Sequence, residues 1–131
     1  MSAIAINDLI IRIKNGYLAQ KEQIESPYSK MRVEVLKKLK ELGYIADFKE
    51  EEISKGVKKL VIDLKYEANT PALVDVKLYS KSGRRWYIKA KEINAVKGNT
   101  GYLIISTSKG IMTNYEAKEK NLGGELLFEI Y

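Results

Sequence analysis

The sequence predicts an α+β fold, with a small N-terminal α/β domain over residues 1–70 that packs against a β-rich C-terminal domain over residues 71–131 containing one short helix. Apolar residues recur at helical spacing early in the chain and alternate as in strands later. A polar stretch with a proline, residues 67–71, separates the two halves. The 131 residues, 45% of them hydrophobic, suffice for two small domains that share an interface.

Two helices are expected in the N-terminal domain. The first covers residues 7–18, and its apolar face consists of Ile6, Leu9, Ile10, Ile13 and Tyr17. After an extended piece at residues 23–27, Ser29 is expected to cap a second helix that ends at Gly43. Its buried stripe is expected to consist of Val33, Leu36, Leu39 and Leu42. The sequence thus predicts two amphipathic helices.

A strand pair follows these helices. Residues 44–51 and 57–66 have strand character, and Lys55-Gly56 supplies the turn between them. Alternation of Leu60, Ile62 and Leu64 indicates a sheet with one covered face.

The C-terminal domain is expected to be mainly β. Residues 74–80 and 85–89 are predicted to be strands that meet at Ser82-Gly83, followed by a short segment at 91–96 and a turn at 99–101. A strand then ends at Ser106. A short helix over residues 114–120 is capped by Thr113 and Glu116, and a final strand covers 125–131 after a reversal at Gly123-Gly124.

Composition excludes several classes of function. The chain has no Cys and no His, which removes thiol chemistry, disulfides, zinc sites and imidazole catalysis. Its carboxylates are mostly scattered among lysines, as in residues 49–52, which is typical of a solvated face or a hairpin edge. No apolar run approaches the length of a membrane span and no signal-like start is present. We expect a cytoplasmic protein with no enzymatic activity, cofactor, metal or membrane.

Positive charge is concentrated in one segment. Residues 77–97 contain seven Lys or Arg against one carboxylate, whereas the whole chain has a net charge of +6. Tyr79, Trp86 and Tyr87 are interleaved with these cations, which favours a surface for RNA or DNA over simple solubilising charge or an anionic membrane. Arg84 and Lys89 are expected to contact phosphates. Adjacent strand residues point to opposite faces, and we favour Tyr87 over Trp86 for the surface.

A polar run follows the strand at residues 102–105. Ser106, Thr107, Ser108 and Lys109 precede Gly110, and three hydroxyls with one ammonium suit phosphates and sugar hydroxyls. The run is equally compatible with a structural turn before the capped helix. The Ser106-x-x-Lys109 spacing also matches serine hydrolases that use a lysine, but their companion motifs are absent.

The octet at residues 106–113, followed by Asn121-Leu122-Gly123-Gly124-Glu125, closely resembles the signature of the small-subunit ribosomal protein eight family in its bacterial form. The resemblance covers essentially the whole chain. Other matching motifs occur in the expected order, namely Asp8-Leu9, Arg12-Ile13-Lys14-Asn15-Gly16, Ser29-Lys30 after Pro27, the run Glu41-Leu42-Gly43-Tyr44-Ile45, and Gly83, Arg85 and Tyr87.

The resemblance implies a structural constituent of the ribosome. It implies a primary binder of the central domain of small-subunit ribosomal RNA that helps to assemble the platform, in the cytoplasmic ribosome, beside ribosomal proteins five and twelve. It also allows a messenger RNA target for autoregulation. The implied RNA contacts are Ser106, Thr107, Ser108, Lys109, Gly110, Tyr87 and Arg85 in the C-terminal domain, and Arg12, Lys14, Ser29 and Lys30 in the N-terminal domain. The alternatives are a non-ribosomal nucleic-acid-binding module and a small hydrolase.

Overall fold

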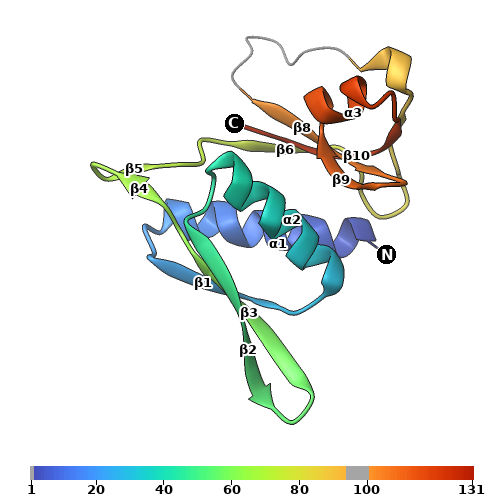
Figure 1. Ribbon diagram of the computed structural model, residues 1–131. Helices are drawn as coiled ribbons and strands as arrows, with labels where there is room; N and C mark the ends of the chain where they lie inside the picture. The colour runs from blue at the N-terminus through green and yellow to red at the C-terminus, as the bar shows by residue number, and fades with distance from the viewer. Residues whose placement is uncertain (1, 94–100) are drawn as a thin grey trace. The chain divides into compact units, whose positions relative to one another are not determined.

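A computed structural model describes residues 2–93 and 101–131 and confirms the α+β fold (Figure 1). Its contacts divide the chain into two compact units, an N-terminal unit of Asp8–Val74 and a C-terminal unit that joins Met1–Asn7 to Asp75–Tyr131. The division into domains at residue 70 stays a prediction. The turn at residues 99–101 and most of the segment at 91–96 lie outside the described residues, although a 3₁₀ helix, η1 (Ala90–Glu92), begins that segment.

The N-terminal unit combines two helices with a three-stranded antiparallel sheet. The helices are α1 (Ser2–Leu18), which begins in the other unit and starts earlier than expected, and α2 (Lys30–Leu42). The strands are β1 (Gln23–Pro27), β2 (Asp47–Ser54) and β3 (Val57–Asp63), in the order β1-β3-β2. The turn at Lys55-Gly56 is confirmed, with Gly56 at a φ of 77°.

Both ends of α2 are as the sequence predicts. The Ser29 side chain accepts a hydrogen bond from the Arg32 amide, and Gly43 adopts the left-handed conformation, with a φ of 86°. The buried stripe differs from the expected one. Leu36 and Leu39 are fully buried, but Val33 and Leu42 are only half-buried, because Arg32 and Val35 occupy the remaining buried positions.

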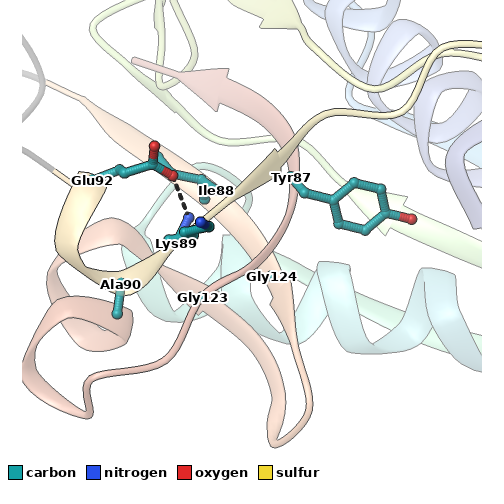
Figure 2. A pocket seen from close by; sticks show the side chains of 7 residues that line it. All are labelled: Tyr87, Ile88, Lys89, Ala90, Glu92, Gly123 and Gly124. Atoms are coloured by element: carbon teal, nitrogen blue, oxygen red, sulfur yellow. Dashed lines mark hydrogen bonds between the residues drawn. The ribbon is translucent and has the colours of Figure 1, made fainter.

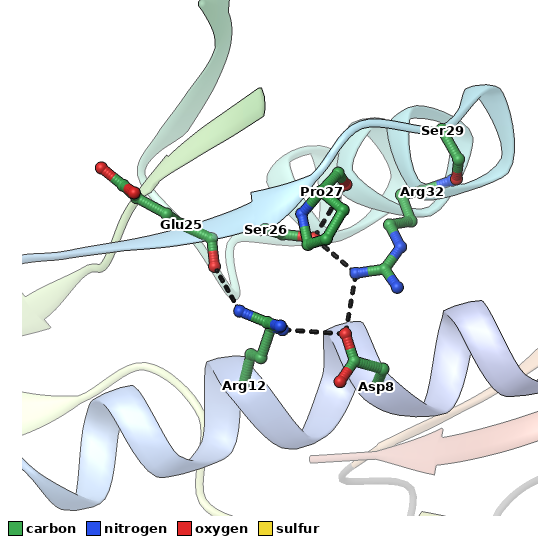
Figure 3. A network of polar contacts seen from close by, with 7 residues as sticks. All are labelled: Asp8, Arg12, Glu25, Ser26, Pro27, Ser29 and Arg32. Atoms are coloured by element: carbon green, nitrogen blue, oxygen red, sulfur yellow. Dashed lines mark hydrogen bonds and ion pairs between the residues drawn. The ribbon is translucent and has the colours of Figure 1, made fainter. Parts of the chain in front are cut away.

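The guanidinium of Arg32 joins three elements of the N-terminal unit (Figure 3). It donates from α2 to the Ser26 hydroxyl of β1 at 2.5 Å and to the Asp8 carboxylate of α1 at 3.0 Å. Arg12 also donates to Asp8, at 2.8 Å, and to the Glu25 carbonyl, at 3.2 Å. A buried charge is tolerated only when it is paired and hydrogen-bonded, so Asp8 and Ser26 make the burial of Arg32 possible.

The strands of this unit are shorter at their inner ends than predicted. Residues 44–46 and 64–65 lie outside β2 and β3. The Tyr17 hydroxyl donates to the Tyr44 carbonyl at 2.6 Å and accepts from the Lys65 amide at 3.0 Å, while the Tyr44 amide closes the end of α2 by donating to Leu39. These backbone groups are therefore bonded outside the ladder.

The polar stretch at residues 67–71 belongs to a small hairpin. Strands β4 (Tyr66–Glu67) and β5 (Thr70–Pro71) pair across Ala68 and Asn69, which have φ values of 50° and 68°. A short polar side chain such as Asn tolerates this conformation, as tight hairpin turns require.

In the C-terminal unit, strand β10 (Gly124–Ile130) holds the sheet together. The path is β6 (Val76–Leu78), β10, β8 (Tyr102–Thr107) and β9 (Gly110–Thr113), and β7 (Tyr87–Ile88) also pairs with β10. The prediction that the strands on either side of Ser82-Gly83 meet each other is therefore wrong, because β6 and β7 both pair with β10.

Ser80 explains this arrangement of β6 and β7. Its buried hydroxyl donates to the Leu126 carbonyl at 2.7 Å and accepts from the Trp86 amide at 3.0 Å, so it links β10 to the chain just before β7. Ser82-Gly83 still forms a turn, closed by the bridge between Lys81 and Arg84, but the chain around it is too irregular to form a ladder.

The polar run is a tight hairpin and not a loop leading directly to a helix. Ser106 and Thr107 end β8, Ser108 and Lys109 form the turn, and β9 intervenes before helix α3 (Asn114–Glu119). The predicted capping box is confirmed, since Thr113 and Glu116 each bond the other's amide. The core on this side of the sheet consists of Ile93, Ile105, Met112, Ala117 and Leu126.

Replacement of Asp8 by Asn should destabilise the protein in a pH-dependent way. Burial raises the pKa of the Asp8 carboxyl, but hydrogen bonds from Arg12 and Arg32 and their charges together hold it below its usual 3.8. The stabilisation is complete above pH 3.8 and is lost as the pH falls through the lower folded-state pKa. We expect Asp8→Asn to cost about 1–3 kcal/mol of unfolding free energy at pH 7, because the buried Arg32 loses a charged partner.

Urea unfolding at pH 7 and at about pH 3 checks this expectation. Glu34→Gln, on the exposed side of α2, is the control and should leave stability unchanged at both pH values. An Asp8→Asn loss of equal size at both pH values would contradict the assigned role of the ion pairs.

Candidate nucleic-acid interface

A row of three polar side chains crosses the C-terminal sheet. The strand register places Glu125 of β10 directly opposite Tyr87 of β7 on one side and Ser106 of β8 on the other. Side chains directly opposite each other in antiparallel strands project from the same face. Tyr87, Glu125 and Ser106 therefore share one face, and the alternation places it opposite the face on which Leu126 and Ile105 enter the core.

Two glycines let the backbones around this row approach closely. A Cβ on Gly124 would lie 2.1 Å from the Ser106 carbonyl oxygen, and one on Gly123 would lie 2.4 Å from the Ile88 carbonyl oxygen. The prediction that the chain reverses at Gly123-Gly124 is wrong. The residue with a positive φ after α3 is Asn121, at 56°, so the chain turns there. Because these glycines have no side chain, β7 and β8 can lie close to β10 on its two sides.

Glu125 belongs to the signature at residues 121–125, but no pattern in the sequence indicated it as an RNA contact. Its side chain is only 10% exposed, and Arg85 lies 3.7 Å from its Oε1 atom. Among the described residues its Oε2 atom is buried without a hydrogen-bond partner. A buried acceptor without a partner costs free energy in the isolated protein, so it can gain a partner on binding a ligand that donates. Alternation along the last strand could have placed Glu125 beside Ser106 only if the pairing register had been known.

The three hydroxyls of the polar run have different environments. The Thr107 hydroxyl donates to the Gly110 carbonyl at 2.8 Å and accepts from the Lys109 amide at 3.1 Å, so it stabilises the hairpin turn. Ser106 is half-buried and Ser108 is exposed, and within the described part of the chain neither hydroxyl has a hydrogen bond. Gly110 has a φ of 115° and supplies the backbone conformation of the turn.

Cationic side chains that are close to the row in sequence lie on the surface. Arg84, Arg85, Lys89 and Lys109 are all exposed. The Arg84 guanidinium lies 5.5 Å from the centre of the Trp86 ring, which in turn packs 5.2 Å from Tyr79. Trp86 is therefore held by intramolecular contacts, whereas Tyr87 is 70% exposed.

A pocket of about 500 Å³ adjoins Tyr87 (Figure 2). Residues 87–90, Glu92, Gly123 and Gly124 line it. Glu92 accepts a hydrogen bond from the Lys89 amide at 2.9 Å, and the Tyr87 side chain extends away from these two residues (Figure 2). Its lining is mainly apolar, and Lys89 and Glu92 are its charged members.

The N-terminal candidate residues do not form a comparable site. Arg12 is bonded to Asp8 and to the Glu25 carbonyl, and the Ser29 hydroxyl serves as the cap of α2. Lys14 is half-buried and Lys30 is exposed. Arg12 also lines a pocket with Asn15, Lys21 and Gln23.

The described residues contain no group of three or more acidic, His or Cys side chains that could hold a metal ion. None of the described helices is both long enough and apolar enough to span a bilayer.

Comparison with known proteins gives the class of protein to which this arrangement belongs. The family described as "Ribosomal protein S8" matches residues 5–131. The chain is 41% identical to the small ribosomal subunit protein uS8 of Neorickettsia sennetsu and 39% identical to that of Mesorhizobium japonicum, in each case over 96% of both chains. The uS8 protein of Mycoplasmopsis synoviae is 41% identical over the same shares.

The chain therefore belongs to the ribosomal protein S8 family, a family of small-subunit ribosomal proteins and not of enzymes. The predicted family is confirmed, and the hydrolase alternative with Ser106 as nucleophile is wrong.

Replacement of Gly124 by Ala should destabilise the C-terminal unit. The new methyl group would overlap the Ser106 carbonyl oxygen, and overpacking of this kind costs about 1–3 kcal/mol. Thermal unfolding with circular dichroism measures the loss. Gly56→Ala is the control, because its Cβ would meet nothing within 4 Å and only its φ of 77° is unfavourable, which costs about 1–2 kcal/mol.

The two variants should differ in RNA binding. Gly124→Ala separates Ser106 from Glu125 and should weaken binding even at temperatures where the variant is folded, whereas Gly56→Ala should bind normally. Equal RNA affinity of the two folded variants would contradict the role of the close approach.

Proposed function

We propose that this protein is a primary binder of the central domain of small-subunit ribosomal RNA and that it helps to assemble the platform. The observation that supports this most directly is the row of Tyr87, Glu125 and Ser106 beside four exposed cations. Family membership supports the ribosomal setting.

The row has the chemistry needed for an RNA minor groove. A-form RNA presents a wide, shallow minor groove with 2′-hydroxyls and base edges. The Ser106 hydroxyl can donate to or accept from a 2′-hydroxyl, and the Glu125 carboxylate can accept from a 2′-hydroxyl or an exocyclic amino group. A donor from RNA would supply the partner that Glu125 Oε2 does not have among the described residues. Tyr87 is exposed enough to stack on an unpaired base.

The other candidate residues divide into two roles. Arg84, Arg85, Lys89 and Lys109 neutralise phosphates, which gives affinity with little sequence preference. Thr107 and Gly110 shape the turn, so that Ser108 and Lys109 are presented on the surface. Selectivity in this proposal comes from Ser106, Ser108 and Glu125.

A second, weaker RNA contact is proposed for the N-terminal unit. Arg12 and Lys30 would contact phosphates, with Lys14 and Ser29 beside them. Arg12 would have to share its guanidinium with Asp8, so its contribution is smaller than that of the exposed C-terminal cations. The proposal also includes ribosomal proteins five and twelve as neighbours, a messenger RNA target for autoregulation and a place in the cytoplasmic ribosome.

Removing both free serine hydroxyls should weaken RNA binding without affecting folding. We expect Ser106→Ala with Ser108→Ala to lose about 2–4 kcal/mol of binding free energy, because RNA groups are left without hydrogen-bond partners. Titration against the isolated RNA helix from the central domain measures this loss. Thr107→Val is the matched comparison and should lower the unfolding temperature, since its hydroxyl bonds within the turn. Unchanged affinity of the double serine variant would remove the row from the interface.

The cations should act without regard to sequence. Arg84→Ala and Lys89→Ala should weaken binding to cognate and scrambled duplexes by similar factors. Each should reduce the slope of log affinity against log salt by about one unit, the value for one phosphate. Affinity measured over a series of potassium chloride concentrations gives the slope. A loss confined to the cognate RNA would argue against phosphate contacts, and Lys118→Ala on α3 is a charge-matched control.

A further inference from the structure

The two edges of the N-terminal sheet differ in how they are protected. The order β1-β3-β2 leaves β1 and β2 with one free side each. On β1, Pro27 has no amide hydrogen and the Glu25 carbonyl accepts from Arg12 at 3.2 Å. Both features prevent another strand from pairing there.

The edge of β2 is open. The Leu64 amide donates to the Glu22 carbonyl, one residue beyond the end of β1. Because the direction of the backbone N–H and C=O groups alternates along a strand, those of the even-numbered residues of β3 face β1 and those of the odd-numbered residues face β2. Through the register with β3, the backbone groups of Phe48, Glu50 and Glu52 then face away from the sheet. The Asp47 side chain accepts from the Phe48 amide at 2.8 Å, and within the described residues the outward groups of Glu50 and Glu52 have no partner.

This edge is also the most acidic part of the chain. Strand β2 has four carboxylates, Asp47 and Glu50–Glu52 in sequence, against the single Lys49. The nearest cations neutralise this charge only in part. Lys40 lies 2.9 Å from Asp47, whereas Lys58 lies 3.4 Å from Glu50 and the half-buried Lys59 lies 3.7 Å from Glu51. In a protein with a net charge of +6, such an edge repels RNA and a second copy of itself, and it attracts a cationic strand.

Apolar side chains lie at the far end of the same hairpin. Ile53 is 61% exposed and Val57 is 51% exposed, on either side of the Lys55-Gly56 turn. Within the N-terminal unit, this end of β2 and β3 extends beyond α2 (Figure 1). The hairpin end therefore offers an apolar contact next to the acidic edge.

We propose that the open edge of β2 is a docking site for an extended, basic segment of another protein, which adds as a strand beside Glu50 and Glu52. Main-chain hydrogen bonds to Glu50 and Glu52 supply the pairing, their carboxylates select lysine or arginine, and Ile53 holds an apolar side chain at the end. The inference concerns a protein partner and is independent of the RNA site on the C-terminal unit.

The test uses the full-length protein labelled with ¹⁵N and a synthetic octapeptide of alternating Lys and Val. The amide signals of Glu50 and Glu52 should shift and become protected from hydrogen exchange, whereas those of Lys49 and Glu51, already bonded to β3, should change much less. An octapeptide of alternating Glu and Val should have no effect.

Two variants separate the pairing from the charge. Glu50→Pro removes an outward amide and one carboxylate but no ladder bond, and should weaken the affinity for the basic peptide by about threefold to tenfold relative to Glu50→Gln, which removes the charge alone. Glu50→Lys with Glu52→Lys should weaken it by at least about tenfold. Glu34→Lys with Glu119→Lys changes the net charge equally at exposed sites elsewhere and should have little effect.

Several results would overturn the proposal. They are the absence of shifts with the basic peptide, shifts of the same amides with an RNA duplex, and shifts that depend on protein concentration alone, which would indicate a second copy. Undiminished peptide affinity in Glu50→Lys with Glu52→Lys, shown to be folded, would overturn it as well.

Discussion

The close contact of β10 with the strands on both its sides is the constraint on which the C-terminal unit depends. Gly124 and Gly123 leave no room for a Cβ against Ser106 and Ile88, so three backbones meet where a larger residue would hold them apart. Ser80 completes this junction by bonding Leu126 and the Trp86 amide at once. The positions of Tyr87, Glu125 and Ser106 on one face follow from this backbone geometry in the isolated protein. Preorganisation of this kind reduces the entropy that binding costs.

The N-terminal unit depends on a polar junction instead. Arg32 is nearly as buried as its apolar neighbours on α2, and it joins α2 to α1 and β1 through Asp8 and Ser26. Such a junction gives less stability than packed apolar side chains, but its directional hydrogen bonds fix how the three elements lie relative to one another. Tyr17 has a similar role at the other end of the sheet, where its hydroxyl bonds both Tyr44 and Lys65.

Local sequence signals predicted most elements but not their partners. The Ser29 cap, the Gly43 end of α2, the Lys55-Gly56 turn and the Thr113–Glu116 capping box depend on residues close in sequence, and all were predictable. The pairing of β6 and β7 with β10 joins residues 36 to 54 positions apart, and no local pattern specifies it. The place of Glu125 beside Ser106 was missed for the same reason, since it is a consequence of register, although the residue itself belongs to the signature at 121–125. Arg32 was missed because a cation within an apolar stripe usually lies at its flank.

The irregularity in β10 between Leu126 and Phe128 has a consequence for how this family can vary in length. The bulge inserts Leu127, whose carbonyl accepts from Tyr79, and it brings Phe128 opposite Ile104, on the same face as Glu125. Loss of Leu127 would leave a regular ladder in which Leu126 and Phe128 keep their faces, because the bulge residue is the extra one, but it would remove the carbonyl to which the Tyr79 and Ser80 amides donate. Natural selection can therefore lengthen or shorten the chain at the Lys55-Gly56 turn with little penalty, whereas loss of the bulge residue would leave the Tyr79 and Ser80 amides without their acceptor.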